Sequence, residues 1–68
     1  MRREMLINVR LSYGKTQKEV ARDLKISTIY IRKLETGNSK PGRETMLKLE
    51  NYYGVSMREL FPDIFFMC

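Results

Sequence analysis

Residues 16–37 read TQKEVARDLKISTIYIRKLETG. The first four letters form a capping box, in which the Thr16 hydroxyl and the Glu19 carboxylate each accept a backbone N–H at the start of a helix. Ser27 is a typical N-cap for a second helix, and Gly37 is a typical residue to end it. The pattern predicts two short helices joined by the tight turn KIS.

Apolar spacing in the same stretch predicts how the two helices pack. Ala21 is small enough to lie where two helices cross closely, and larger apolar residues flank the turn and line the inner side of the second helix. These larger residues are Val20, Leu24, Ile26, Ile31 and Leu34. Their register predicts a helix-turn-helix over about residues 17–36.

Working outward, helical spacing and end signals predict three further helices, over about residues 2–12, 43–53 and 56–61. Residues 56–59, SMRE, have the pattern of a second capping box. The last helix should end before Pro62, and an apolar tail follows over residues 62–68. We expect an all-α fold with no sheet, although the tail could be extended.

Size and composition fit one small intracellular domain over residues 1–68. The chain is 43% hydrophobic and 31% charged, as expected for a globular protein. No apolar run approaches the roughly 18 residues that span a bilayer, and the N-terminus lacks the apolar region of a secretion signal. We therefore expect a cytoplasmic protein without membrane contact.

The residue types argue against an enzyme or a metal site. The chain has no histidine, which is the commonest metal ligand and general base, and its one cysteine is Cys68. We find no acid pair or phosphate-binding loop with a supporting fold. We expect no catalytic residue, no metal and no cofactor.

The net charge is +5, from 13 Lys and Arg against 8 Asp and Glu. Positive charge attracts nucleic acid by releasing its counterions. Many small proteins are basic only for solubility, so the charge becomes informative if it gathers on one face.

The chain resembles the lambda-repressor-like family, which includes phage Cro and repressor proteins and the XRE-type regulators. The matching segments are TQKEVARDLKIS, TIYIRKLETG and KPGRETMLKLENYYGVSMRELF. With the first helix, the resemblance covers most of the chain. It implies a compact five-helix DNA-binding domain in which residues 28–36 form the recognition helix.

The outer face of that helix suits base reading. If Ile31 and Leu34 face the core, one stripe on the opposite side contains Thr28, Ile29, Arg32 and Lys33. An isoleucine exposed to water is wasteful, whereas in the major groove it can cover a thymine methyl, and the basic residues can donate to guanine. The alternative is that Ile29 packs on its own domain and the basic side chains are solvated. We predict base contact.

Phosphate contacts are expected at helix ends near DNA. Gln17 matches the family residue that binds a phosphate, and free amides at a helix start suit an anion. The other candidates are Lys18, Asn38, Lys40 and Arg43. A solvated surface position is the alternative for Lys18, Asn38 and Lys40.

The resemblance also implies a structural ion pair between Arg10 and Glu35, tying the first helix to the end of the recognition helix.

Three residues depart from the family pattern. Lys25 stands where a glycine is frequent, and a side chain at positive φ costs roughly 1 kcal/mol. Lys15 replaces an apolar residue, and Glu50 replaces a small one.

Apolar residues near the C-terminus are too many to leave in water. They are Phe61, Ile64, Phe65, Phe66 and Met67. One alternative is that they fold back over the first helix. Small relatives use this region to dimerise, and a symmetric operator requires a two-fold dimer. We predict that these residues form a homodimer interface.

The expected function is sequence-specific binding of double-stranded DNA at a palindromic operator, by a dimeric repressor or autoregulator of transcription. The alternative is a protein-interaction module, of antitoxin or antirepressor-partner type, that acts through the apolar tail with DNA binding secondary. Salt distinguishes the two, because contacts to phosphate weaken steeply as salt rises. RNA binding is less expected, since the stripe lacks an exposed aromatic platform.

Overall fold

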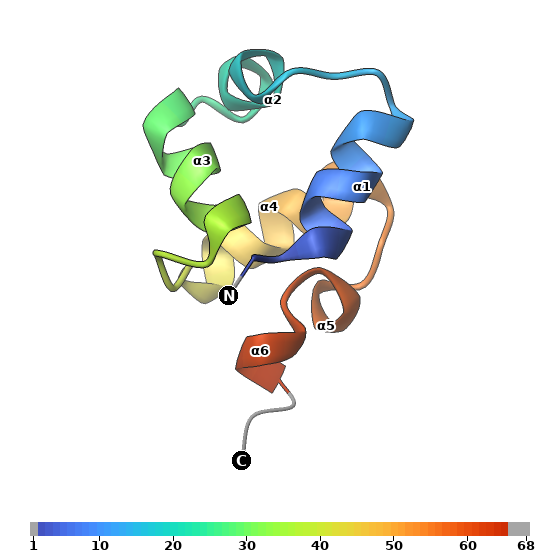
Figure 1. Ribbon diagram of the computed structural model, residues 1–68, viewed down its shortest axis with the longest axis vertical. Helices are drawn as coiled ribbons and strands as arrows, with labels where there is room; N and C mark the ends of the chain where they lie inside the picture. The colour runs from blue at the N-terminus through green and yellow to red at the C-terminus, as the bar shows by residue number, and fades with distance from the viewer. Residues whose placement is uncertain (1, 66–68) are drawn as a thin grey trace.

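The computed structural model describes residues 2–65, and within that range it contains six helices and no strand (Figure 1). The helices are α1 (Glu4–Ser12), α2 (Gln17–Leu24), α3 (Thr28–Thr36), α4 (Arg43–Tyr53), α5 (Met57–Leu60) and α6 (Pro62–Phe65). The predicted all-α class is confirmed. The sixth helix is additional to the five that were expected.

This additional helix, α6, follows from the chemistry of Pro62. Proline lacks an N–H, but the first amides of a helix have no intrahelical partner, so proline is well tolerated at the first position. The N–H groups of Ile64 and Phe65 donate to the carbonyl of Phe61 at 3.1 and 3.3 Å. Pro62 therefore follows the end of α5 and also begins another helical turn.

The local signals around α2 and α3 are confirmed. The N–H of Glu19 donates to the Thr16 hydroxyl at 3.1 Å, and the N–H of Thr16 donates to the Glu19 carboxylate at 2.8 Å. The Ser27 hydroxyl accepts the N–H of Tyr30 at 3.0 Å. Lys25 makes the turn in the left-handed region, with φ 59° and ψ 42°.

The predicted capping box at residues 56–59 is wrong. The Ser56 hydroxyl accepts the N–H of Arg58 at 3.2 Å, while the N–H of Glu59 donates to the Ser56 carbonyl. The carboxylate of Glu50, from α4, accepts the N–H of Met57 at 3.2 Å. Ser56 therefore caps α5 through the N–H of Arg58, and Glu50 from the neighbouring helix accepts a second N–H at the same end.

Lys15 belongs to a polar surface cluster that joins α2 to α4. Its ammonium donates to the Asp23 carboxylate at 3.2 Å and lies 5.9 Å from the ring centroid of Tyr52. The Tyr52 hydroxyl donates to the same carboxylate at 2.5 Å. The hydrogen bonds from Tyr52 and then Lys15 lower the pKa of Asp23.

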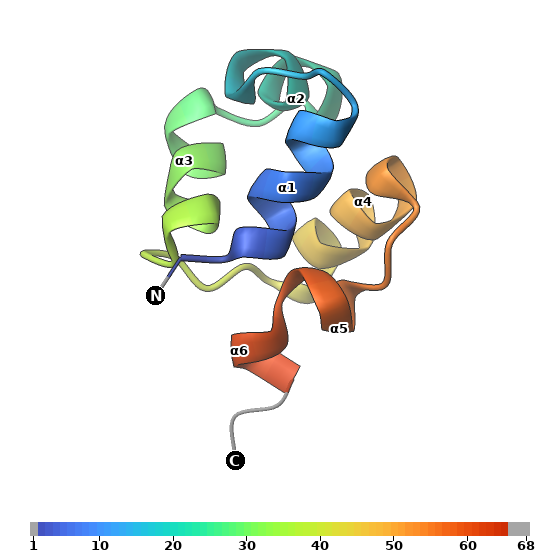
Figure 2. The ribbon, with the colours of Figure 1, turned by 45° about the vertical axis from the view of Figure 1, so that its right-hand side comes forward.

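One cluster of buried side chains draws on α1 to α5. It contains Leu6, Val20, Ala21, Ile31, Leu34, Met46, Leu49, Tyr53, Leu60 and Phe61. In both ribbon views α2 lies at one end of the molecule and α5 and α6 lie at the opposite end, with α1 and α4 between them (Figures 1 and 2). No helix within residues 2–65 is long and apolar enough to cross a membrane.

Candidate nucleic-acid interface

The outer face of α3 is open to solvent. Ile31 and Leu34 are buried, whereas Ile29 is 60% exposed and both Arg32 and Lys33 are exposed. Thr28 is half-buried at the start of the same stripe. The helix thus presents an apolar side chain and two cations on the side that faces away from the core.

A buried polar cluster holds the second half of α3. Nε of Arg10 lies 2.7 Å from Oε2 of Glu35, and Nη2 of Arg10 lies 3.2 Å from Oε1, so the ion pair that the resemblance implies is present. Nε2 of Gln17 donates to the same Oε1 at 3.0 Å. Arg10 also donates to the carbonyl of Lys15 at 2.8 Å. The cluster joins α1, α2 and α3.

Gln17 therefore makes a structural hydrogen bond to Glu35. Its contact with a DNA phosphate remains a prediction. Its amide nitrogen carries two hydrogens, and the bond to Glu35 uses one of them. The backbone N–H groups of Gln17 and Lys18 lie in the first turn of α2, where a helix offers no internal acceptor. Lys18 is exposed beside them.

The loop after α3 carries the next two phosphate candidates. Gly37 ends the helix at φ 83°, and the N–H of Asn38 donates to the carbonyl of Lys33 at 2.9 Å. Asn38 and Lys40 are exposed, while Ser39 between them is half-buried. The two candidates therefore project from the loop on either side of the less exposed Ser39, whose carbonyl accepts a hydrogen bond from a buried side chain.

The residue that holds the loop is Arg3, which sequence reasoning missed. Its side chain is 2% exposed and donates to the carbonyls of Leu34 and Ser39 at 2.7 and 2.8 Å. It also donates to both carboxylate oxygens of Asp63, at 3.0 and 2.9 Å, and lies 5.3 Å from the ring centroid of Phe61. The hydrogen bonds from Arg3 hold the pKa of the Asp63 carboxyl below its ordinary value. The only feature of the sequence that pointed to this contact was Asp63, a single acidic residue in an otherwise apolar tail.

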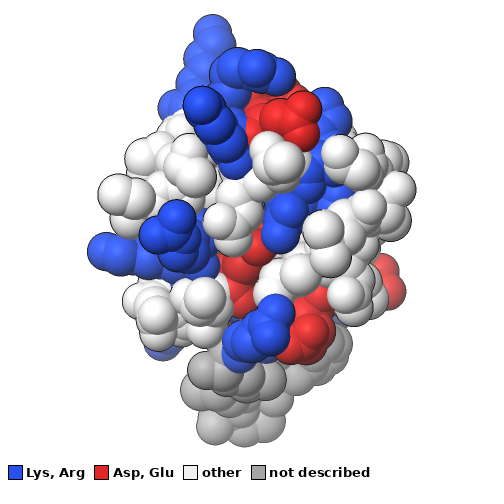
Figure 3. Space-filling view, turned by 45° about the horizontal axis from the view of Figure 1, so that its top comes forward, with Lys and Arg blue, Asp and Glu red and all other residues white. Residues whose placement is uncertain are grey.

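Basic side chains gather over α2 and α3. Figure 3 shows them at the top and left of the view, with acidic side chains among them. The exposed basic residues of these helices and of the turn between them are Lys18, Arg22, Lys25, Arg32 and Lys33. No group of His, Cys, Asp or Glu in residues 2–65 could hold a metal ion.

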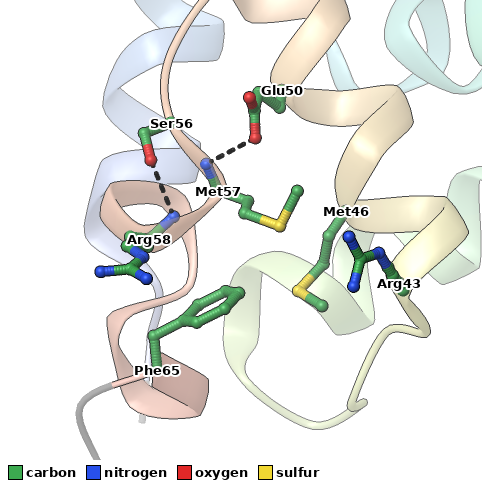
Figure 4. Close-up of a pocket in the computed structure, with 7 residues that line it drawn as sticks. All are labelled: Arg43, Met46, Glu50, Ser56, Met57, Arg58 and Phe65. Atoms are coloured by element: carbon green, nitrogen blue, oxygen red, sulfur yellow. Dashed lines mark hydrogen bonds between the residues drawn. The ribbon is translucent and has the colours of Figure 1, made fainter.

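Arg43 lies beside α5 and α6. It lines a pocket of about 470 Å³, whose other lining residues are Met46, Glu50, Ser56, Met57, Arg58 and Phe65 (Figure 4). The apolar part of this pocket comes from two methionines and Phe65. The surroundings of Arg43 therefore differ from those of Asn38 and Lys40.

The residues predicted for a dimer interface do not share one environment. Phe61 is completely buried against the core, so its assignment to an interface is wrong. Ile64 is half-buried and packs against the core. Phe65 is 39% exposed. Phe66 and Met67 lie outside the described residues.

Comparison with known proteins assigns the family. The chain matches the model of a helix-turn-helix family over residues 6–60, a span that includes all of α2, α3 and α4. No match was found among curated proteins or among solved structures. Since the matched span covers most of the chain, the protein belongs to the Cro/C1-type helix-turn-helix family of DNA-binding transcription regulators.

Proposed function

We propose that the protein binds specific sequences of double-stranded DNA by placing α3 in the major groove. The observation that carries the proposal is the exposed stripe on a helix that is fixed from its opposite side. Ile29 gains little by facing water, but a thymine methyl would cover it. Arg32 and Lys33 would donate to guanine O6 and N7, and Thr28 would lie beside them.

Phosphate contacts would flank this stripe. We assign them to the start of α2 and to the loop after α3, from which Gln17, Lys18, Asn38 and Lys40 would reach the backbone. Arg43, exposed at the start of α4, remains a further phosphate candidate beside this set, although it also lines the pocket with Phe65. Such contacts would set the position of the protein on the duplex without reading its sequence.

We further propose that the protein acts as a dimeric repressor or autoregulator. A two-fold dimer places two recognition helices about one helical turn apart, roughly 34 Å, and so favours palindromic sites. The exposed Phe65 supports an interface at α6. A protein bound across a promoter in this way would exclude polymerase.

Selection of binding sites from random duplexes tests the proposal. The full chain is incubated with the duplex pool at about 0.15 M salt, the physiological ionic strength at which salt screens the attraction between exposed charges. The oligomer mass of the protein is measured in parallel. We expect enrichment of one sequence, in two half-sites with the spacing given above. A pool that stays random after repeated rounds would contradict sequence-specific binding.

A further inference from the structure

One buried guanidinium joins three separate segments of this protein. Arg3 donates from Nη1 to the carbonyl of Leu34, in the last turn of α3, and to the carbonyl of Ser39, in the loop. Its Nε and Nη2 donate to the two carboxylate oxygens of Asp63, in α6. The backbone N–H of Arg3 also donates to the carbonyl of Glu35 at 2.8 Å.

These bonds depend on one another because a guanidinium is planar and rigid. Its N–H groups point in fixed directions, so the two bonds to Asp63 set the direction in which Nη1 meets both carbonyls. The last carbonyls of a helix have few internal partners; that of Leu34 accepts the N–H of Gly37 at 3.4 Å and the shorter bond from Arg3, which also brings a positive charge to the negative end of α3. The same guanidinium thus links the carboxylate of Asp63 to the end of α3.

The position of α6 depends in turn on this ion pair. A four-residue helix has no stability of its own, and side-chain contacts hold it in place. They include the bonds between Asp63 and Arg3, the packing of Ile64 on the core, and the guanidinium of Arg58 at 6.0 Å from the ring centroid of Phe65. Of these, only the bonds to Arg3 lead directly to the loop.

We propose that Arg3 and Asp63 couple α6 to the DNA-facing loop, so that both are positioning residues for DNA binding. This inference rests on the proposed function, because the loop carries Asn38 and Lys40 on either side of the clamped Ser39 carbonyl. Movement of α6 away from Arg3 releases that clamp and weakens DNA binding, while the core stays folded. The C-terminal helix is thereby a point at which DNA affinity is controlled.

The test compares Asp63→Asn with Glu59→Gln in the full chain. Each substitution removes one negative charge from the C-terminal region, so general attraction to DNA changes alike, but Glu59 is an exposed residue of α5. We measure affinity for one selected duplex at constant salt, and amide hydrogen exchange without DNA. Asp63→Asn is expected to bind roughly three- to thirtyfold more weakly than Glu59→Gln, the usual range for coupling mutations.

Hydrogen exchange separates positioning from a general loss of stability. Amides of residues 34–38 should exchange faster in Asp63→Asn than in Glu59→Gln, while amides of residues 20–24 in α2 keep their rates. Asp63→Glu keeps the charge but moves the carboxylate by one methylene, and it should give an intermediate affinity. The matched control for Asp63→Glu is Glu59→Asp. If Asp63→Asn does not fold, the comparison of Asp63→Glu with Glu59→Asp takes the place of the comparison of Asp63→Asn with Glu59→Gln.

Equal affinities and equal exchange in the matched pair would overturn the coupling. Faster exchange in α2 as well as in residues 34–38 would also overturn it, because Asp63 would then support only global stability. If the wild-type chain binds no duplex, the proposed function fails, but the exchange comparison still decides whether α6 and the loop are coupled.

Discussion

At the scale of single residues, Arg32 and Lys33 report base reading most directly. Replacing either with alanine should cost about 1–3 kcal/mol on a selected duplex, because a donor pair to guanine is lost. Kd is measured on the selected duplex and on a scrambled duplex at one salt concentration. Arg22→Ala is the control, since it removes the same charge from an exposed position on α2. A similar loss on both duplexes for all three variants would contradict base reading.

The difference between Arg10 and Arg3 shows what a sequence can reveal about single residues. Ile29, Arg32 and Lys33 were placed on the outer face of α3 by helical periodicity alone, and the structure has them exposed. The Arg10–Glu35 pair followed from the family resemblance. Arg3 had neither guide, because its side-chain partners are 31, 36 and 60 residues away and no local pattern relates them.

At the scale of elements, the turn between α2 and α3 stores backbone strain at Lys25. This is the one non-glycine residue with positive φ between residues 2 and 65. Lys25→Gly should raise the free energy of unfolding by about 0.5–1 kcal/mol, because glycine adopts this conformation without a Cβ clash. The gain stays small since glycine also makes the unfolded chain more flexible. Urea unfolding monitored by circular dichroism measures it.

Gly54→Ala is the matched control for this turn prediction. Gly54 ends α4 at φ +70°, and an added Cβ would meet nothing within 4 Å, so only the backbone conformation is tested. Alanine there should lower the free energy of unfolding by about 1 kcal/mol. A loss of stability in Lys25→Gly would contradict the prediction, because the strain at Lys25 would then be smaller than the cost of the flexibility that glycine adds to the unfolded chain.

Local signals were reliable where a helix caps itself and misleading where another element takes part. The stretches at Thr16 and Ser56 have the same sequence pattern, but at the second one the partner carboxylate is Glu50 from α4 and not Glu59. Pro62 is equally ambiguous, because a proline that stops one helix is also suited to begin the next. Nothing in the neighbouring residues distinguishes these outcomes before the helices are packed together.

At the scale of the whole molecule, α3 is fixed by different forces along its length. Its first half packs through Ile31 against the apolar core, and its N-terminus is capped by Ser27. Its second half packs through Leu34 and is held in addition by Glu35 in the ion pair with Arg10 and by the bonds from Arg3. A rigid recognition helix is required for base reading, since contacts to base edges depend on fixed geometry.

The proposed dimer is a property of the whole molecule, and it would decide how the protein binds a palindromic site. Phe65→Ser should raise the dissociation constant of the dimer by roughly tenfold or more, because the phenylalanine that the dimer would bury is replaced by a polar side chain. Sedimentation over a range of protein concentrations measures the shift. Leu11→Ser on α1 is the control, because that side chain is 59% exposed and lies outside α6. Truncation before Asp63 would be less informative, since it also removes the partner of Arg3.

The same variant separates dimerisation from base reading when duplexes are compared. A monomer that reads one half-site should lose affinity for a palindromic duplex but not for a duplex carrying a single half-site, because the second recognition helix is no longer tethered. Phe65→Ser should therefore reduce the preference for the palindrome, whereas Arg32→Ala should weaken binding to both duplexes. An unchanged dimer in Phe65→Ser would place the interface elsewhere on the molecule and remove α6 from it.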